Sequence, residues 1–453
     1  MIGSVWEEVG GAAPTRPPLD GDRRADVAIV GAGYTGLWTA YHLLALRPDL
    51  DVVVLEERHV GFGASGRNGG WATADVAIRR NRATRSHGRQ AVVDLLRAMQ
   101  RAVDDIGEIA RTEGIDCDYA KGGTLTLATS QAQVPRIKEM VEHERQWGFG
   151  PDDYRWMEPD EVATRVRVRR CLGAFYTPHC AAIHPMKLVL GLASAIERQG
   201  ATICEGTRAE TVEPGRVRTN SGVVTAPIVL RATEAFTAHD MPRKVIPVYS
   251  LMVATEPLDD AVWSRIGLDR RETFHDGRHL VIYGQRTADG RFAFGGRGAP
   301  YHFGSRIRPE FDLHPSTHRA VEAMLRDLFP PLSGAGITHR WGGPVAMPRD
   351  LAASIRFDPD SGMGWAGGYV GLGVAASQLA GRTLAELAIG AATERTSLPW
   401  VGHESRSWEP EPLRWMGVNA GRMLAPAADA MEDRTGRPSR VFGGALQRLL
   451  GER

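Results

Sequence analysis

Cysteine, lysine and net charge are all scarce in this sequence. The four cysteines among 453 residues form no CxxC pair and no metal-ligand pattern, which excludes a disulfide framework and favours reduced thiols. Only four of the 55 basic residues are lysines, and the formal net charge is +1. No bulk field therefore attracts nucleic acid or an anionic membrane. We expect a cytoplasmic protein without a metal ion, a nucleic-acid partner or a membrane partner.

The given sequence shows no signal-peptide pattern and no uninterrupted apolar run, so we expect no transmembrane span. The first eight residues have neither the basic nor the apolar region of a signal peptide. The most apolar stretch, Val27 to Leu46, is interrupted by three glycines and fits a strand followed by a helix better than a membrane span. With 43% hydrophobic and 24% charged residues, the chain is typical of a globular protein large enough for two domains.

The residues from Asp26 to Glu56 follow the pattern of a dinucleotide-binding βαβ unit. An apolar run predicts a buried strand over 26–30, the glycine motif GAGYTG opens an apolar helix to Leu46, and a second strand over 51–55 ends at Glu56. Such glycines permit a tight turn, a close pyrophosphate and close packing of helix on strand, and the helix N-terminus offers N–H donors. The acid can accept hydrogen bonds from a ribose.

A second glycine-rich stretch, Gly61 to Gly70, distinguishes FAD from NAD. Five of its ten residues are glycine, which lets the backbone approach a large ligand closely. Ser65 can contact phosphate, Arg67 can offset its charge, and Asn68 to Gly70 can pass beneath a flat ring; the alternative is a flexible surface loop. The FAD-binding residues expected in the two motifs are Gly31, Gly33, Tyr34, Thr35, Gly36, Glu56, Glu57, Arg58, Gly63, Ala64, Ser65, Arg67, Asn68, Gly69 and Gly70.

Periodicity predicts the other elements. We expect an irregular surface arm at 1–24 and a second glycine-dense turn between a strand and a helix at 367–373. The remaining predicted helices are 90–113, 130–147, 185–199 and 315–329, and the remaining predicted strands are 123–128, 227–230, 249–255, 279–283, 291–295 and 337–346. From Trp400 onward we expect a docked extension whose aromatic residues, Trp408 and Trp415, cover a surface.

The chain resembles the D-amino-acid oxidase superfamily of FAD-dependent amine oxidoreductases, especially its branches like gamma-glutamylputrescine oxidase and aminophosphonate oxidoreductase. The motifs that carry this resemblance are GAGYTGLWTAYHL, LEERHVGFGASGRNGG, IHPMKLVLGLA, ATEAFTA, DGRFAFGGR, RWGGPVAMPRD and GYVGLGVAASQLAGRTLAELAIG. The resemblance implies further FAD contacts at Val212, Ala232, Thr233, Gly371, Leu372, Gly373 and Val374. It also implies oxidation of an amine to an imine.

The implied architecture is α/β, with a Rossmann-type FAD-binding domain and an α+β substrate domain that contains an antiparallel sheet. The FAD-binding domain is expected from 25–89, 168–243 and 339–398, and the substrate domain from 90–167 and 244–338. Residues 1–24 form the arm and residues 399–453 the C-terminal extension. Function is expected where the two domains meet.

Three positions depart from the family pattern. Ala375 stands where sarcosine oxidases carry a lysine that binds the substrate carboxylate, and Ala293 stands where they carry an oxygen-activating lysine. Leu372 stands where relatives often carry histidine. These differences argue against an ordinary α-amino acid substrate and leave fast use of oxygen open. No cysteine or histidine occupies a familiar flavin-attachment position, so we expect non-covalent FAD.

Four residues are candidates for the catalytic site, namely Tyr283, Arg297, Trp341 and Tyr249. A phenol can orient an amine nitrogen, and a guanidinium can bind an anionic group with two hydrogen bonds. Each also has a structural interpretation, because aromatic residues on strands usually pack and arginines are usually solvated. His184, directly before Pro185, is interpreted as a helix cap and not as a base.

The sequence therefore predicts an FAD-dependent oxidase or dehydrogenase of a small primary or secondary amine. The imine would hydrolyse, and electrons would pass from the flavin to oxygen or to a carrier. Alternatives are an aminophosphonate or N-alkyl amino acid oxidase or dehydrogenase, and a flavin-binding protein without turnover. An NAD-dependent dehydrogenase is a further alternative, against which the second glycine-rich stretch argues.

Overall fold

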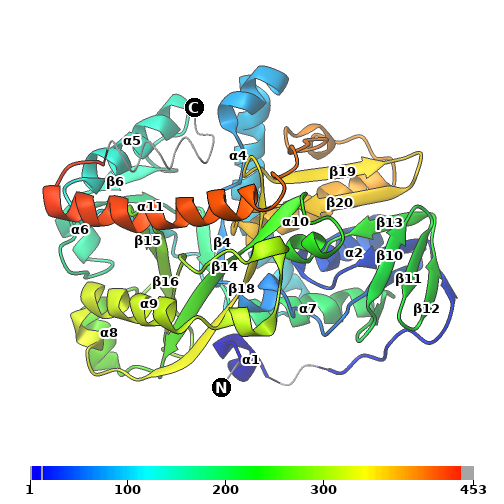
Figure 1. Ribbon diagram of the computed structural model, residues 1–453, viewed down its shortest axis with the longest axis horizontal. Coiled ribbons are helices and arrows are strands. Elements are labelled where there is room, and N and C mark those ends of the chain that lie inside the picture. The colour runs from blue at the N-terminus through cyan, green and yellow to red at the C-terminus, as the bar shows by residue number, and fades with distance from the viewer. Residues whose placement is uncertain (1–2, 12–13, 440–453) are drawn as a thin grey trace.

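The computed structural model describes residues 3–11 and 14–439, and two large β-sheets dominate it. A mostly parallel sheet and a mostly antiparallel sheet lie at opposite ends of the elongated molecule (Figure 1). A four-stranded sheet and a two-stranded sheet complete the β-structure of the described residues. No helix in those ranges is long and apolar enough to cross a membrane.

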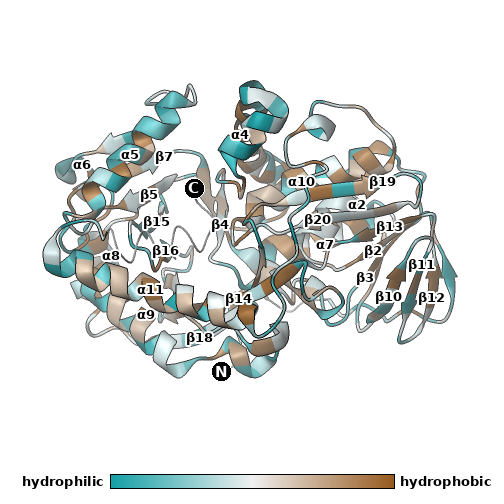
Figure 2. Ribbon diagram, turned by 45° about the horizontal axis from the view of Figure 1, so that its top comes forward, coloured by the Kyte–Doolittle hydropathy of each residue, from teal (hydrophilic) through white to brown (hydrophobic). Residues whose placement is uncertain are grey.

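The parallel sheet has six strands that come from three separated stretches of chain. In spatial order they are β19 (Ser354–Asp358), β20 (Met363–Gly367), β13 (Ile228–Arg231), β2 (Val27–Val30), β3 (Val52–Leu55) and β9 (Thr202–Cys204). Only the edge strand β19 is antiparallel to its neighbour. Every residue of β2 and β3 is buried, because both faces of a parallel sheet are covered. Figure 2 shows these central strands as the hydrophobic middle of their domain.

Three helices pack on one face of the parallel sheet. They are α2 (Tyr34–Leu46), α7 (Pro185–Arg198) and α10 (Gly373–Ala388), and α2 lies between the other two. The other face is covered by the four-stranded sheet, through a cluster that includes Leu19, Val53 and Val217. In spatial order this sheet contains β1 (Arg23–Arg24), β12 (Gly222–Thr225), β11 (Arg216–Thr219) and β10 (Ala209–Glu213).

The second large sheet has eight strands and its own aromatic core. In spatial order they are β18 (Ile337–Pro348), β14 (Val245–Thr255), β17 (Phe292–Gly296), β16 (Ile282–Arg286), β15 (Thr273–Asp276), β5 (Thr124–Leu127), β7 (Ala174–Thr177) and β6 (Arg155–Met157). Phe274, Phe292, Phe294 and Phe329 pack together on one face. The helices α8 (Asp260–Ile266) and α9 (Pro315–Leu328) contribute to that core.

Two strands of this sheet lie outside the residues predicted for the substrate domain. Strand β18 pairs with β14 along its whole length, so the predicted boundary at 338/339 divides one strand. Strand β7 falls within 168–243, yet it pairs with β5 and β6. Both differences arise because pairing between distant strands leaves no local signal in the sequence. The division into domains itself stays a prediction.

The remaining elements complete the described part of the chain. Helix α4 (Arg80–Glu113) begins ten residues before its predicted start and is kinked at Gly88, where φ is +82°. The other helices and strands are α1 (Val5–Val9), α3 (Ala64–Arg67), α5 (Gln133–Gln146), α6 (Pro159–Ala163), α11 (Leu413–Thr435), β4 (Trp71–Thr73) and β8 (Cys180–Ala182). Short 3₁₀ segments are Glu234–His239, Phe303–Ser305, Pro309–Asp312, Pro330–Leu332 and Arg395–Ser397.

The N-terminal arm differs from its prediction. Ser4 caps α1 through a capping box with Glu7, and Trp6 is only 2% exposed. The prediction that the arm lies on the surface is therefore wrong for the residues of α1. The apolar side chains Val5 and Trp6 reach the core once the helix forms and places them on one side.

The C-terminal extension lies across the antiparallel sheet as α11, at the front of Figure 1. Trp408 donates a hydrogen bond from Nε1 to the Met347 carbonyl oxygen and packs against the sheet. Trp415 is 42% exposed, and its role in covering a surface stays a prediction. Residues 440–453 of the predicted extension lie outside the described residues.

Candidate active site

The two predicted glycine motifs meet at the N-terminus of α2. The backbone N–H of Tyr34 donates to Ser65 Oγ at 2.8 Å, and a Cβ at Gly33 would lie 2.9 Å from the same oxygen. Gly31 has φ of +108°, and a Cβ there would lie 2.6 Å from the Ala232 carbonyl oxygen. These glycines are needed because three loops come together here.

Glu56 follows β3 at the carboxyl end of the parallel sheet. Its Oε2 accepts a hydrogen bond from the Ala32 N–H at 3.0 Å, and its Oε1 accepts one from the Arg58 N–H at 2.9 Å. Burial raises the pKa of Glu56, although both amides act in the opposite direction. Glu57 and Arg58 are exposed beside it. The acid thus stands where a ribose hydroxyl would need an acceptor.

Val212 makes no hydrogen bond to Glu56 among the described residues. The neighbour of Glu56 in this part of the chain is Thr207. The Thr207 N–H donates to the Glu56 carbonyl oxygen at 2.8 Å, whereas Val212 lies on β10 and packs against the cluster that contains Leu55. Its contact with FAD stays a prediction.

The second glycine stretch is more ordered than a loop, because it contains the single turn α3. Asn68 closes that turn: its Nδ2 donates to the Ala64 and Ser65 carbonyl oxygens, and its Oδ1 accepts from the Gly70 N–H at 2.8 Å. Gln285 Nε2 donates to the carbonyl oxygens of Gly69 and Gly70 at 2.8 and 2.9 Å. A side chain of the antiparallel sheet therefore holds this stretch in place.

Arg67 already has an acidic partner. Its guanidinium pairs with Asp312 at 2.6 Å and lies over the ring of Phe62. Burial raises the pKa of Asp312 to about 6, although Arg67 lowers it. A phosphate that reached Arg67 would compete with this carboxylate.

The third glycine segment predicted to bind FAD is the turn between β20 and α10. Val370 and Gly371 have positive φ angles of 59° and 91°, and Leu372, Gly373 and Val374 begin α10. Glu234, one residue after Ala232 and Thr233, accepts hydrogen bonds from the Gly368 and Tyr369 N–H groups at 2.8 and 3.2 Å. Tyr369 in turn hydrogen-bonds Thr35 at 3.0 Å. Three predicted FAD segments are thereby joined.

Tyr283 lies between the second glycine stretch and the antiparallel sheet. Its hydroxyl hydrogen-bonds Ser250 Oγ at 2.8 Å, and its ring meets Trp71 edge-on with centroids 5.8 Å apart. A Cβ at Gly69 or Gly295 would lie 2.9 or 2.5 Å from this ring. These contacts place Tyr283 against the second glycine-rich stretch, and its position facing the flavin ring stays a prediction.

Arg297 is a half-buried cation without an acidic partner. Its guanidinium donates to the Val370 carbonyl oxygen at 3.0 Å, and a Cβ at Gly371 would lie 3.2 Å from it. Within the described ranges no carboxylate forms an ion pair with it. Burial lowers the pKa of Arg297, and the nearby Tyr283 acts in the opposite direction. The cation thus joins the glycine turn to the tyrosine.

Trp341 and Tyr249 occupy different faces of the same sheet. Trp341 donates from Nε1 to the Arg67 carbonyl oxygen at 2.9 Å and meets Trp6 edge-on. Tyr249 is 1% exposed and packs against Phe311. Its neighbour Ser250 faces Tyr283, and successive residues of a strand point to opposite faces. The structure therefore brings Tyr283, Arg297 and Trp341 toward the glycine motifs and leaves Tyr249 behind the sheet.

Sequence reasoning missed Gln285, Glu234, Ser250 and Trp6. Glu234 follows a predicted strand at the carboxyl edge of the sheet, where functional residues of such folds collect, so position alone could have indicated it. The capping-box pattern Ser4-Val5-Trp6-Glu7 was likewise present for α1. Gln285 and Ser250 carried no local signal.

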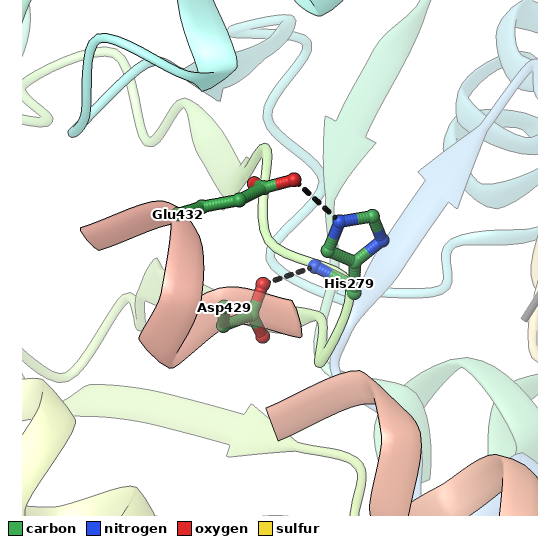
Figure 3. A group of neighbouring side chains, drawn as sticks. All are labelled: His279, Asp429 and Glu432. Atoms are coloured by element: carbon green, nitrogen blue, oxygen red, sulfur yellow. Dashed lines mark hydrogen bonds and ion pairs between the residues drawn. The ribbon is translucent and has the colours of Figure 1, made fainter. Parts of the chain in front are cut away.

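One cluster has the composition of a metal site. Atoms of His279, Asp429 and Glu432 lie within 4.8 Å of one another (Figure 3). Asp429 accepts from the backbone N–H groups of His279 and Leu280, and Glu432 accepts from His279 Nε2 at 2.9 Å and from Arg136. Because protein donors occupy these oxygens, the cluster is explained as an anchor of α11.

FAD fits the residues that are present. The first N–H groups of α2 have no acceptor within the helix, and Glu56 follows the second strand of the motif, where a ribose acceptor is predicted. The residues that would hold FAD are those of the three glycine segments, together with Ala232 and Thr233.

Comparison with known proteins identifies the family of this chain. The sequence matches the family "DAO: FAD dependent oxidoreductase" over residues 26–387. It is 32% identical over 374 residues to gamma-glutamylputrescine oxidoreductase of Escherichia coli, covering 80% of this chain and 83% of that protein.

Solved structures show the same fold. Glycine oxidase from Bacillus cereus has a TM-score of 0.67 at 20% identity and covers 82% of this chain and 97% of its own. L-proline dehydrogenase from P. horikoshii has a TM-score of 0.66 at 20% identity, with 84% and 98% covered. The predicted fold class and the predicted FAD cofactor are confirmed. The chain belongs to the DAO family of FAD-dependent oxidoreductases.

Proposed function

We propose that this enzyme oxidises a small primary or secondary amine that carries an anionic group. The observation that carries the proposal is the environment of Arg297. Its guanidinium lies beside Tyr283 and the glycine turn of α10 without an acidic partner among the described residues. A desolvated cation needs a counter-charge, and a guanidinium binds carboxylate or phosphonate with two parallel hydrogen bonds.

The other site residues suit an amine on the same side of the sheet. The Tyr283 hydroxyl, held by Ser250, would accept a hydrogen bond from the amine or donate one to it, and so orient its nitrogen. Trp71 and Trp341 would exclude water around the reacting C–H bond. FAD, when bound, supplies the two-electron acceptor.

The overall reaction balances with a hydride and a proton leaving the substrate. The carbon next to nitrogen loses the hydride and the nitrogen loses the proton, which leaves a C=N bond. Water then hydrolyses the imine to a carbonyl compound and releases ammonia or an amine. The electrons pass finally to oxygen or to a carrier protein.

Two substrate classes share the required anionic group. The Escherichia coli relative is named for gamma-glutamylputrescine, which combines an amine with a distal carboxylate. An aminophosphonate offers the same combination with a phosphonate. Ala375 replaces the carboxylate-binding lysine of sarcosine oxidases, which favours recognition of the anion by a different cation, and Arg297 is that candidate.

The test is anaerobic reduction of the bound flavin, followed by its visible absorbance. Amino acid-conjugated polyamines, N-methyl amino acids and aminophosphonates are compared with matched amines that lack the acid. We expect an acidic pool to bleach the flavin. In Arg297→Met the concentration for half-maximal reduction should rise at least about tenfold, the size expected for a lost charged hydrogen bond.

Arg306→Met provides the control, because Arg306 is exposed on the surface. Two results would contradict a role for the anionic group. One is equal bleaching by neutral amines, and the other is an unchanged concentration for half-maximal flavin reduction in Arg297→Met. A yellow protein that no amine bleaches would favour the alternative of a flavin-binding protein without turnover.

A further inference from the structure

A cavity lies beside the predicted FAD-binding segments and is separate from them. Its volume is about 240 Å³, and Trp6, Asp118, His184, Lys187, Arg271 and Asp289 contribute to its walls. None of the residues expected to bind FAD or the amine lines it. The walls come from α1, from the start of α7, from the turn between β16 and β17, and from two connecting loops. Elements of both large sheets therefore meet around this space.

Arg271 is the cation of the cavity wall that forms no ion pair. Its guanidinium donates to two backbone carbonyl oxygens, those of Asp118 and Arg286, and no carboxylate of the described chain forms an ion pair with it. Burial lowers the pKa of Arg271, and Asp118 acts in the opposite direction. Arg271 also has a positive φ of 55°, which a non-glycine residue adopts only at a cost.

The two acids in the walls already have basic partners. Asp118 binds Lys187 Nζ with both carboxylate oxygens, at 3.0 and 3.1 Å. Asp289 binds Arg291 at 2.8 Å and accepts from the Thr287 hydroxyl. Because Arg291 lies outside the cavity wall, the four charged side chains of the wall sum to zero, and Arg271 is the one of them that forms no ion pair within the described residues.

His184 adds a buried donor that has no acceptor. The side chain is 4% exposed, and its Nδ1 accepts a hydrogen bond from the Lys187 N–H at 3.2 Å. Since Nδ1 is an acceptor, the neutral ring carries its proton on Nε2. Nε2 is buried without a partner. Burial lowers the pKa of His184 to about 4, so the ring stays neutral at pH 7 and Nε2–H remains available to a ligand.

We propose that this cavity binds a small oxyanion, a phosphate or a short carboxylate, between Arg271, Lys187 and the Nε2–H group of His184. The guanidinium supplies the charge, the ammonium group that Asp118 holds supplies a further donor, and the imidazole supplies a directed neutral donor. A volume of about 240 Å³ corresponds to about eight water molecules. That space suits phosphate or a short dicarboxylate and is too small for a nucleotide.

Trp6 links the cavity to the second glycine-rich stretch, Gly61 to Gly70. Trp6 lies in the cavity wall, meets His184 edge-on at 5.1 Å, and donates from Nε1 to the Asn68 carbonyl oxygen at 2.9 Å. Asn68 closes the turn α3. A bound anion would therefore stabilise α1 against the FAD-binding segment.

The test is calorimetric titration of the FAD-bound enzyme, without any amine, with sodium phosphate, sodium succinate and, at matched ionic strength, sodium chloride. We expect saturable binding of phosphate or succinate at one site per chain and none of chloride. Competition between the two anions should show that they share the site and identify the preferred one. Absence of saturable binding by both anions would overturn the proposal.

Two variants assign the site. Arg271→Gln should weaken the dissociation constant at least about tenfold, whereas Arg270→Gln, which changes the exposed neighbouring arginine, should leave it unchanged. His184→Phe keeps a ring against Trp6, removes only the donor, and should weaken binding about fivefold or more. It serves as the test if Arg271→Gln does not fold, which its flavin spectrum would reveal. Unchanged binding in a folded Arg271→Gln or in His184→Phe would contradict the assignment.

Discussion

Glu234 shows how one side chain can join two cofactor segments. It follows the Ala232-Thr233 pair and accepts hydrogen bonds from two N–H groups of the α10 glycine turn. Burial raises its pKa from 4.5 to about 7, and the two amides only partly oppose this effect. The carboxyl group therefore keeps its proton in the folded protein at a pH where the unfolded chain has released it.

This shift predicts a pH-dependent stability. Below about pH 4.5 the group is protonated in both states, and the stabilising effect is complete. As pH rises through about 7 the folded state must release the proton too, so the advantage is lost. The free energy of unfolding is measured with urea at pH 5, 6, 7 and 8 for the wild type and for Glu234→Gln. Between pH 5 and about 7 the wild-type value should fall, relative to that of the variant, by up to about 1.4 kcal/mol per pH unit, and above pH 7 the difference should level off.

The exposed Glu57 provides the control for this experiment. Glu57→Gln should shift the whole curve slightly and leave its slope unchanged. If the wild type and Glu234→Gln had parallel curves between pH 5 and 8, the raised pKa of Glu234 would be refuted.

At the scale of elements, the fit of α2 against β2 depends on a single missing side chain. A Cβ at Gly36 would collide with the carbonyl oxygen of Gly31 and would also lie 3.3 Å from Ile29. The helix could accommodate it only by moving away from the strand. The N–H groups at the start of α2 would then lose their position.

Alanine substitutions in two helices should therefore have opposite effects. Gly36→Ala should lower the melting temperature and abolish retention of FAD through gel filtration, because overpacking costs about 1–3 kcal/mol. Gly417 lies in α11, and a Cβ added there would have no other atom within 4 Å. Gly417→Ala should stabilise by about 1 kcal/mol through helix propensity. FAD retention by Gly36→Ala would contradict the tight packing.

The elements that were predictable are those with a local cause. The elements β2, α2 and β3 agree with their predicted ranges to within one or two residues. Their burial pattern, glycine spacing and terminal acid all lie within one short stretch of sequence. The helices α7 and α9 likewise begin at a proline and follow an apolar stripe. Their signals needed no partner elsewhere in the chain.

Other elements depended on distant partners. The predicted strand 279–283 begins only at Ile282, because the N–H groups of His279 and Leu280 bond Asp429 of α11. Gln285 holds the second glycine-rich stretch, which is more than two hundred residues away in sequence. The glycine motifs could therefore be predicted as a cofactor site, whereas the residues that hold them could not. The roles of Tyr283, Arg297 and Trp341 stay predictions.

At the scale of the whole molecule, α1 connects the two large sheets. Trp6 donates to Asn68 of the flavin loop, and Glu8 pairs with His339 on β18 at 2.8 Å. Ser4 adds a longer contact to the Gly66 carbonyl oxygen. A helix of five residues thus contacts both the second glycine-rich stretch and the antiparallel sheet.

Removing the buried indole should weaken both stability and cofactor binding. Trp6→Ala should destabilise the protein by about 3–5 kcal/mol, as for other large buried aromatic residues, and should raise the dissociation constant of FAD. Thermal unfolding followed by flavin fluorescence measures both effects. Trp415→Ala is the matched control, because that side chain is 42% exposed and surface changes are usually within about 0.5 kcal/mol. Similar losses in both variants would contradict a specific role of α1.

The interleaving of the parallel sheet has a consequence for biosynthesis. Its central strands come from the first part of the chain, but β20 and α10 are made only after the antiparallel sheet is complete. During translation the early strands must therefore wait with an unpaired edge, which is a hazard for aggregation. Tight cofactor capture becomes possible only when nearly the whole polypeptide has left the ribosome, so FAD binding acts as a late step that locks the finished fold.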